Sequence, residues 1–351
     1  MNETEHCKVL ISPSFSTAEK LIFLIINLFT AFVAIFGNCL VITVVFLNSK
    51  LQTRSVCFLV FLSVTDLITG ALVQPLSMAI ILRKWDNKTN CYLSMFLAFI
   101  ATIMCGSSAS MLTLISYDRY MHLSKLNNYS VHMTSFKIKI LLIAVSMYPA
   151  LTGIFMFTIL SSVFYYLVII ESLLLMIIMC FCYYKSWKIV KSQALKRTRS
   201  KENKRLVDRH WKVAKSMVIL ITFYFLAWTP LTVFTAFDEI RKLFKYNLGI
   251  HDHNKLCILY FCLLCGFANA AVNPFIYFQR NSKLRKAMAT LLNQILCSAC
   301  RVAEIELLNE NDNLNATNTG KNLNKNGFCD NVFLNKIVVK KETNSQLDLK
   351  D

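Results

Sequence analysis

Two polar clusters stand where long apolar stretches of this 351-residue chain end. Asp118, Arg119 and Tyr120 close the third stretch, and the segment NPFIY at 273–277 closes the seventh. Hydrocarbon penalises ionisable and amide side chains, so those that stay at the edge of a membrane span usually carry function. Together the two clusters predict a relay that passes a signal across a membrane.

Two acidic side chains lie deeper, inside apolar stretches. Asp66 is in the middle of the second stretch, and Glu171 is about halfway along the fifth. A carboxylate in hydrocarbon is too costly to stay ionised without a partner. Glu171 is therefore either a hydrogen-bond acceptor or counter-ion for a ligand, or a protonated carboxyl bonded to a neighbouring helix. The sequence leaves both interpretations open.

Membrane-spanning helices must position these residues. Of the whole chain, 55% is apolar and only 17% is charged, which excludes an ordinary soluble globule. Apolar runs of the roughly 20 residues that cross about 30 Å of hydrocarbon recur along the sequence. The seven predicted spans are about 20–46, 54–82, 92–122, 138–158, 162–186, 213–237 and 256–278. The expected fold is an all-α membrane protein, a seven-transmembrane helix bundle with a short amphipathic cytoplasmic helix.

Composition divides the chain into four predicted parts. They are an extracellular N-terminus (1–19), the transmembrane bundle (20–278), an amphipathic membrane-surface helix (279–296) and a disordered cytoplasmic tail (297–351). The third part has apolar residues at helical spacing and a basic face, which is typical of a helix on the inner leaflet. The tail is rich in Asn, Lys, Asp and Glu with few aromatic residues, which is typical of disorder.

The net charge of +18 gathers on one side of the predicted bundle. Twelve Lys or Arg residues lie between Lys185 and Lys215, against only two acidic residues. The positive-inside rule places this segment in the cytoplasm, so the N-terminus is expected outside and the C-terminus inside a multi-pass plasma-membrane protein. A basic segment beside a membrane does not indicate nucleic-acid binding, and no nucleic-acid partner is expected.

Candidate modification sites fit this orientation. Asn2 and Asn87 stand in Asn-x-Thr glycosylation acceptors that would lie outside. The three cysteines expected outside are Cys7, Cys91 and Cys257. Their odd number leaves the disulfide pairing open. Cys297 and Cys300 follow a basic segment at membrane-surface depth and are either palmitoylated or unmodified.

Five motifs in order resemble those of the rhodopsin-like (class A) G-protein-coupled receptors. They are Gly37-Asn38, LSVTD at 62–66, Asp118-Arg119-Tyr120, Trp228-Thr229-Pro230 and NPFIY at 273–277. The resemblance covers about residues 20–296. It implies a receptor that binds an extracellular ligand and activates heterotrimeric G proteins, with arrestin, receptor kinases and membrane lipids as further partners. A short second outer loop and Met176 in place of a fifth-span proline are similar, more weakly, to the melanocortin receptors and their lipid-receptor relatives.

The same resemblance implies a sodium site in the middle of the bundle. Its residues would be Asp66, Ser108, Asn269 and Asn273. Asn269 and Asn273 are four residues apart and so share one face of the seventh span. The alternative is a water-filled polar network around a protonated Asp66. Apart from this structural sodium ion, no cofactor is expected.

The resemblance also implies an activation switch. Its residues would be Asp118, Arg119, Tyr120, Tyr184, Trp228, Pro230, Asn273, Pro274 and Tyr277, with Tyr183 as the alternative to Tyr184. Pro230 removes a helix hydrogen bond and bends the sixth span, so the inner half of that span can swing outward. In the family, an acid at the foot of this span clamps the arginine in the off state. His210 stands there, so the clamp should be weak and some activity without ligand is expected.

The ligand is the least determined part. An aminergic receptor would carry Asp where this chain has Ala101, and an opsin would carry Lys where it has Phe267. A typical monoamine and retinal are therefore not expected, and the apolar pocket suits a lipid, a small amphiphile or a peptide tip. The expected ligand-binding residues are Gln74, Ala101, Thr102, Cys105, Glu171, Trp228, Leu231, Thr232, Thr235, Leu263 and Phe267.

Other functions are weighed against the receptor. A receptor-shaped protein that is constitutively active, or that has no ligand and acts by pairing with other receptors, stays possible on sequence alone. A transporter or channel predicts several charged residues along the spans, whereas only Asp66 and Glu171 lie deep here. An enzyme is not expected, because the spans contain no His, Asp and Glu cluster with metal-ligand or triad spacing.

Overall fold

The structure is a computed structural model that describes residues 16–85, 91–124, 129–155, 161–196, 201–244, 252–280, 282–295 and 297. The described part is helical apart from short connections. Its helices are α2 (Thr17–Leu47), η1 (Ser49–Leu51), α3 (Arg54–Ile68), η2 (Thr69–Val73), α4 (Gln74–Trp85), α5 (Cys91–Ser124), α6 (Tyr129–His132), α7 (Ser135–Phe155), α8 (Ser161–Lys196), α9 (Lys201–Leu243) and α10 (Asp252–Arg280). The all-helical bundle expected from the sequence is confirmed. Asn2, Cys7, Asn87, Cys300 and the predicted tail beyond it lie outside the described residues.

The seven predicted spans correspond to α2, the α3–η2–α4 segment, α5, α7, α8, α9 and α10. Six of them are long and apolar enough to cross a membrane, and α9 is not among these six. The basic segment predicted as a loop between Lys185 and Lys215 is mostly helical, because α8 continues to Lys196 and α9 starts at Lys201. Its Lys, Arg, Glu and Gln side chains are good helix formers, so the two spans extend beyond the predicted membrane limits.

Helix α2 begins with a capping box formed by Ser16 and Glu19, three residues apart in the sequence. The Glu19 amide donates to Ser16 Oγ (3.3 Å), and the Ser16 amide donates to Glu19 Oε2 (2.8 Å). These two bonds satisfy backbone donors that the first helical turn leaves without partners. The predicted span started three residues too late because it followed the apolar run and not the cap.

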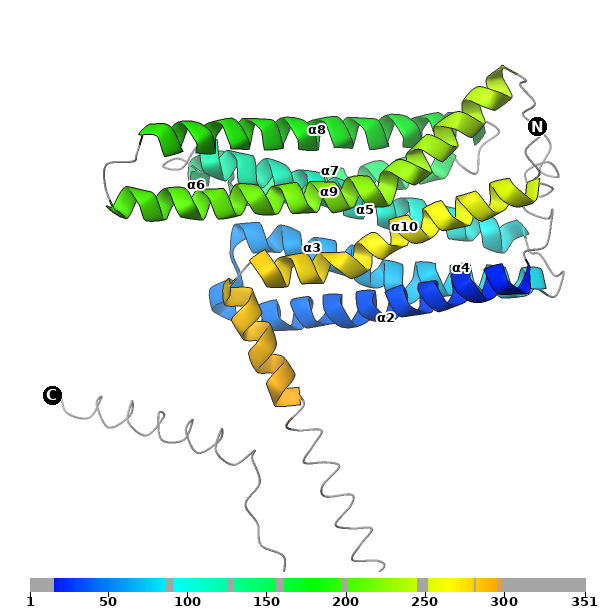
Figure 1. Cartoon of the computed structure of the whole chain (residues 1–351), viewed down its shortest axis with the longest axis horizontal. Helices are drawn as coiled ribbons and strands as arrows, with labels where there is room; N and C mark the ends of the chain where they lie inside the picture. The colour runs from blue at the N-terminus through cyan, green and yellow to red at the C-terminus, as the bar shows by residue number, and fades with distance from the viewer. Residues whose placement is uncertain are drawn as a thin grey trace, which may run out of the picture. The chain divides into compact units, whose positions relative to one another are not determined.

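The helices pack side by side, with α5 at the centre (Figure 1). Helix α2 packs on α3, α4 and α10, α10 packs on α9, and α9 packs on α8. Helix α5 contacts α3, α4, α7, α8, α9 and α10. Side chains on α5 can therefore meet most of the bundle, which is why the third span carries so many of the predicted site residues.

Two prolines shape the second and sixth spans. Before Pro75 the chain makes a π-helical turn, η2, in which the Gln74 amide donates to the carbonyl of Thr69. Such turns rotate the helix that follows and are frequent at functional sites. Pro230 lies inside α9, which changes direction along its length (Figure 1). The predicted bend of the sixth span agrees with this shape.

The close approach of α2 and α10 requires a glycine. A Cβ added at Gly37 would lie 2.8 Å from Pro274 Cγ and 2.9 Å from Pro274 Cβ. The proline ring belongs to the NPFIY segment and cannot move aside without α10. The Gly37-Asn38 motif of the first span therefore has a packing reason as well as a polar one.

A short helix, residues 282–295, follows α10 and contains the point where the chain divides into two compact units. The chain divides into two units, Met1–Met288 and Ala289–Asp351, and residues 282–295 are helical across this division. Within the first unit, Leu284 and Met288 are buried and four residues apart, while Lys283, Arg285 and Lys286 are exposed. This spacing matches the amphipathic helix predicted for 279–296.

Replacing Gly37 by Ala should lower the stability of the bundle. The added methyl group forces α2 away from Pro274, and such overpacking costs about 1–3 kcal/mol. The measurement is the thermal unfolding midpoint of the purified receptor, with Phe32→Leu on the exposed side of the same helix as the control. An unchanged midpoint for Gly37→Ala would show that the two helices tolerate separation.

Candidate functional site

A buried carboxylate joins three helices in the middle of the bundle. Asp66 on α3 is 1% exposed. Its Oδ1 accepts from Ser108 Oγ on α5 (2.7 Å), and its Oδ2 accepts from Asn273 Nδ2 on α10 (2.7 Å). Both donors are themselves buried. The structure thus brings together three of the four residues predicted for a sodium site, and the fourth, Asn269, is buried one turn before Asn273.

Two further buried polar side chains lie within one helical turn of these residues: Ser63 on α3, and Asn38 of α2, which contacts α10 at Ala270. Asn38 donates from Nδ2 to the carbonyls of Ala34 (2.8 Å) and Ala270 (3.1 Å). Ser63 Oγ lies one helical turn before Asp66. This atom and Asn38 Oδ1 are buried without a hydrogen-bond partner among the described residues. Buried polar atoms of this kind are usually satisfied by water or an ion. The site has the oxygen donors that a hard cation prefers.

The carboxylate of Asp118 is held by neutral donors. Ser55 Oγ on α3 donates to Asp118 Oδ2 (2.9 Å), and the Tyr129 hydroxyl on α6 donates to Asp118 Oδ1. Arg119 Nε is 3.9 Å from Asp118 Oδ2 and has no hydrogen-bond partner among the described residues. The contact of Arg119 with Asp118 is therefore loose, and both carboxylate oxygens already accept a hydrogen bond from another side chain.

Sequence reasoning missed Ser55 and Tyr129. Neither belongs to a motif, and Tyr129 lies in a connection where no helical spacing relates it to Asp118. Burial, together with the hydrogen bond to Asp118, raises the pKa of Tyr129 to about 12. The raised pKa of this neutral acid means that the contact is fully present below the unfolded pKa of about 10. It is lost only as the pH rises through about 12.

The tyrosines of the predicted switch lie in different environments. Tyr277 is 1% exposed on α10. Tyr184 is 59% exposed, so in this structure it does not face the bundle. Tyr183 is half-buried, and its ring lies 6.5 Å from that of Trp187. The rotation of α8 about its axis favours the alternative, Tyr183, over Tyr184 as the side chain on the interior side.

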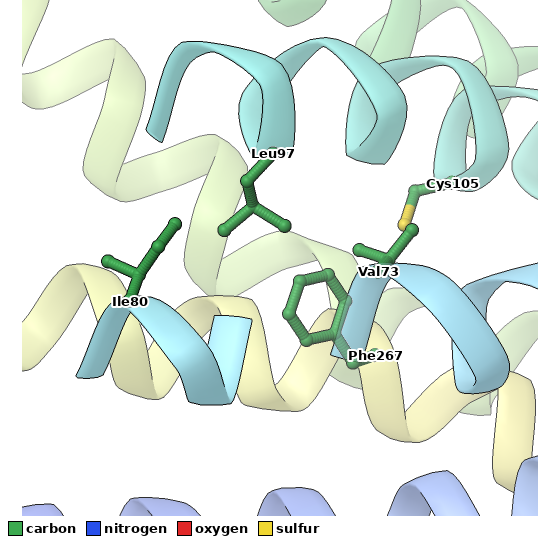
Figure 2. Close-up of a cluster of buried hydrophobic side chains, with 5 residues drawn as sticks. All are labelled: Val73, Ile80, Leu97, Cys105 and Phe267. Carbon is green, nitrogen blue, oxygen red and sulfur yellow. The ribbon is translucent and has the colours of Figure 1, made fainter. Parts of the chain in front are cut away.

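An apolar cluster contains many of the residues predicted for the ligand pocket. Its buried members are Val73, Ile80, Leu97, Cys105 and Phe267 (Figure 2). Cys105 comes from α5 and Phe267 from α10, and both point toward Val73 of η2 (Figure 2). Ala101, Trp228 and Leu263 pack against this cluster. The structure therefore brings five of the predicted pocket residues together in one apolar cluster.

The three threonines predicted for the ligand pocket donate their hydroxyl protons to backbone carbonyls of their own helices. Thr102 donates to the carbonyl of Ala98 (2.8 Å), Thr232 to that of Trp228 (3.0 Å), and Thr235 to that of Leu231 (2.8 Å). Their hydroxyl oxygens can still accept a hydrogen bond. Any contact they make with a ligand would use that acceptor capacity.

Gln74 is not directed to the predicted pocket. Its Nε2 donates to Asn27 Oδ1 (2.9 Å) and Thr30 Oγ1 (2.8 Å) on α2. The π-helical turn directly before it and Pro75 directly after it set this direction. Gln74 therefore joins the first and second spans, which corrects the expectation that it reaches a ligand beside α5.

Glu171 is the second deep acid. It is 7% exposed on α8, and its Oε1 has no hydrogen-bond partner among the described residues. Both interpretations of Glu171, a contact to a ligand and a protonated carboxyl bonded to a neighbouring helix, therefore stay predictions.

The cysteines expected at the outer ends are only partly described. Cys257 Sγ lies 3.5 Å from Glu19 Oε1. The side chain of Cys91 lies outside the described residues, as does Cys7, so the disulfide pairing stays a prediction. Cys297 is half-buried, and its palmitoylation stays a prediction as well.

Replacing Tyr129 by Phe should loosen the connection between α5 and α7. The change removes one hydrogen bond to a charged group, which is worth about 1.5–3 kcal/mol. Amide hydrogen exchange of residues 129–133 should become at least about tenfold faster, since 1.4 kcal/mol corresponds to a factor of ten. Tyr117→Phe on α5 is the control. Equal exchange rates in both variants would remove Tyr129 from this role.

Comparisons with known proteins agree with this geometry. Residues 37–165 and 154–277 match the family of the 7 transmembrane receptor (rhodopsin family). The chain is 26% identical to the adenosine receptor A3 of Bos taurus over 82% of this chain and 95% of that receptor. It is 28% identical to the histamine H2 receptor of Cavia porcellus over 83% of this chain and 84% of that receptor. The weaker likeness to melanocortin receptors stays a prediction. The matched segments span the Asp66 network, the Arg119 region and helices α9 and α10 with Pro230 and Pro274, and the chain belongs to the rhodopsin family of seven-transmembrane receptors.

Proposed function

We propose that the chain is a plasma-membrane receptor that binds an extracellular ligand and activates heterotrimeric G proteins. The observation that carries this proposal is the Asp66 carboxylate bound by Ser108 and Asn273, because it couples α3, α5 and α10 at one buried point. The basic inner ends of α8 and α9 support an extracellular N-terminus and a cytoplasmic C-terminus. Arrestin and receptor kinases are proposed as further partners on the cytoplasmic side.

The proposed mechanism is a shift between two arrangements of α9. A ligand on the apolar cluster would contact Trp228, which packs against that cluster two residues before Pro230. Because proline removes one backbone hydrogen bond, the helix can bend further there. The inner half of α9 then moves from α5 and exposes Arg119 to the G protein. The ligand acts by binding one arrangement more tightly than the other.

The proposed ligand is small or amphiphilic, or is the tip of a peptide. Support comes from the apolar cluster and from the two groups of relatives, whose names refer to adenosine and histamine. At 26–28% identity these names do not transfer to this chain. Ala101 stands where an aminergic receptor carries its acid, which argues against a typical monoamine mode of binding.

A second candidate is a receptor with high activity in the absence of ligand, or one that acts only by pairing with other receptors. The loose contact of Arg119 with Asp118 favours the first form, because nothing in the described part holds Arg119 Nε. His210, which stands in place of the family's acid, also favours activity without ligand. Its side chain lies outside the described residues.

Nucleotide exchange on purified G proteins tests the proposed function. Receptor in lipid nanodiscs should accelerate exchange on at least one G-protein class without ligand, and a ligand should raise the rate by about 5- to 150-fold, the usual range of coupling between sites. Arg119→Ala should abolish both effects. A receptor that accelerates exchange on no member of a G-protein panel, with or without ligand libraries, would instead support the pairing hypothesis.

We also propose that sodium binds at Asp66. The carboxylate, the Ser108 hydroxyl and the amide oxygens of Asn269 and Asn273 would supply hard oxygen ligands, and Asn38 Oδ1 and Ser63 Oγ offer further acceptors nearby. Bound sodium would supply a positive charge that stabilises the ionised carboxylate. By holding α3, α5 and α10 together, the bound ion would favour the off state.

Sodium should stabilise the wild-type receptor, and Asp66→Asn should remove this effect. At a concentration about a hundred times the dissociation constant, a bound ion contributes about 2.7 kcal/mol. The measurement is the thermal midpoint in sodium chloride against the same concentration of choline chloride. Asp238→Asn at the outer end of α9 is the control. An equal sodium effect in wild type and Asp66→Asn contradicts the proposal.

A further inference from the structure

The two deep acids differ in how the protein satisfies them. Asp66 receives a donor at each carboxylate oxygen, one from Ser108 and one from Asn273. Glu171 is 7% exposed, yet its Oε1 receives no donor from the described residues. A buried carboxyl oxygen without a donor is costly and calls for an explanation. The two oxygens of Asp66 do not raise this question, because each accepts a hydrogen bond from a side chain.

Several helices meet at Glu171. A Cβ added at Gly106 on α5 would lie 2.9 Å from Pro149 Cβ on α7 and 3.6 Å from Glu171 Oε1. The missing side chain at Gly106 is therefore what lets α7 and the carboxyl of α8 approach α5. Tyr148 of α7 and Tyr224 of α9 lie close enough to interact electrostatically with Glu171.

The sequence offers no internal counter-ion for this carboxyl. The segments 91–118 of α5, 140–155 of α7, 161–184 of α8 and 216–240 of α9 contain no Lys, Arg or His. The tyrosines near Glu171 are neutral donors. A carboxylate in hydrocarbon is stabilised chiefly by an opposite charge, and these segments supply none, so an ionised Glu171 would need a cation from outside them.

A second buried polar atom without a partner in the described part of the chain belongs to Trp228 on α9. Trp228 Nε1 is buried and has no hydrogen-bond partner among the described residues. The ring of Trp228 is 6.5 Å from that of Tyr224, which in turn interacts with Glu171. An acceptor on α8 and a donor on α9 are therefore left open around one aromatic side chain, where α5, α8 and α9 meet.

We infer that the ligand is a small organic cation with an apolar body, whose protonated nitrogen binds the carboxylate of Glu171. This inference rests on the proposed receptor function and names the chemical class of its ligand. The apolar body would lie against Tyr224 and Trp228, where aromatic faces also attract a cation. The charge is held on α8, whereas Ala101 leaves the α5 position of an aminergic receptor without an acid.

The test compares cations with neutral molecules of the same shape. The probes are 2-phenylethylamine and tryptamine, each beside the alcohol of the same skeleton, 2-phenylethanol and tryptophol. Binding to full-length receptor in nanodiscs is measured as a shift of the thermal midpoint over a titration. At least one amine should bind about tenfold or more tightly than its alcohol, the difference expected for one charge-assisted hydrogen bond.

Glu171→Gln should abolish this preference for the amine, and Glu171→Asp should keep part of it. Asp238→Asn, an acid at the outer end of α9, is the matched control and should leave the preference unchanged. Equal binding of amine and alcohol, equal amine binding by wild type and Glu171→Gln, or binding of neither amine overturns the inference.

Nucleotide exchange measured on the same discs separates the two proposals. If the receptor accelerates exchange but fails the amine test, the proposed function stands and the ligand class is wrong. If amines bind through Glu171 but no G protein responds, the ligand class stands and the proposed function fails.

Discussion

The bundle depends on one constraint, which is that polar atoms inside a membrane must find partners within the protein. Asp66 meets it by accepting hydrogen bonds from α5 and α10 at once. Because each of the three groups is buried, none can turn to solvent instead. The register of α3, α5 and α10 is consequently tied at this depth, and Pro274 of α10 directly follows one of the residues that tie it.

The same constraint distinguishes the other acids. Asp118 at the inner end of α5 is satisfied by Ser55 and Tyr129, so the neighbouring Arg119 is left loosely held. Glu171 has an unsatisfied oxygen at a depth where the sequence provides no cation. One carboxylate thus joins three helices, one leaves a neighbouring arginine loosely held, and one keeps an oxygen without a donor among the described residues. Their chemistry is alike, and only their neighbours differ.

Much of the candidate site could be predicted because its residues lie in ordered motifs. Asp66, Ser108 and Asn273 were expected together, and they meet. Gln74 could not be placed correctly, because a π-helical turn before it and a proline after it rotate the helix toward α2. Tyr184 was a poorer choice than Tyr183, because sequence gives the period of a helix but not its rotation about its own axis.

The sequence by itself determined the number of spans, their order and the family, because hydropathy and spacing are local properties that hydrocarbon enforces on each segment separately. The tertiary structure alone decided which polar groups meet. Tyr129 reaches Asp118 through a connection with no periodic pattern, and Gly106 opens the approach of Pro149 and Glu171 to α5. Contacts of this kind depend on the rotation of each helix and on its distance from the others. The sequence of a single helix does not determine either quantity.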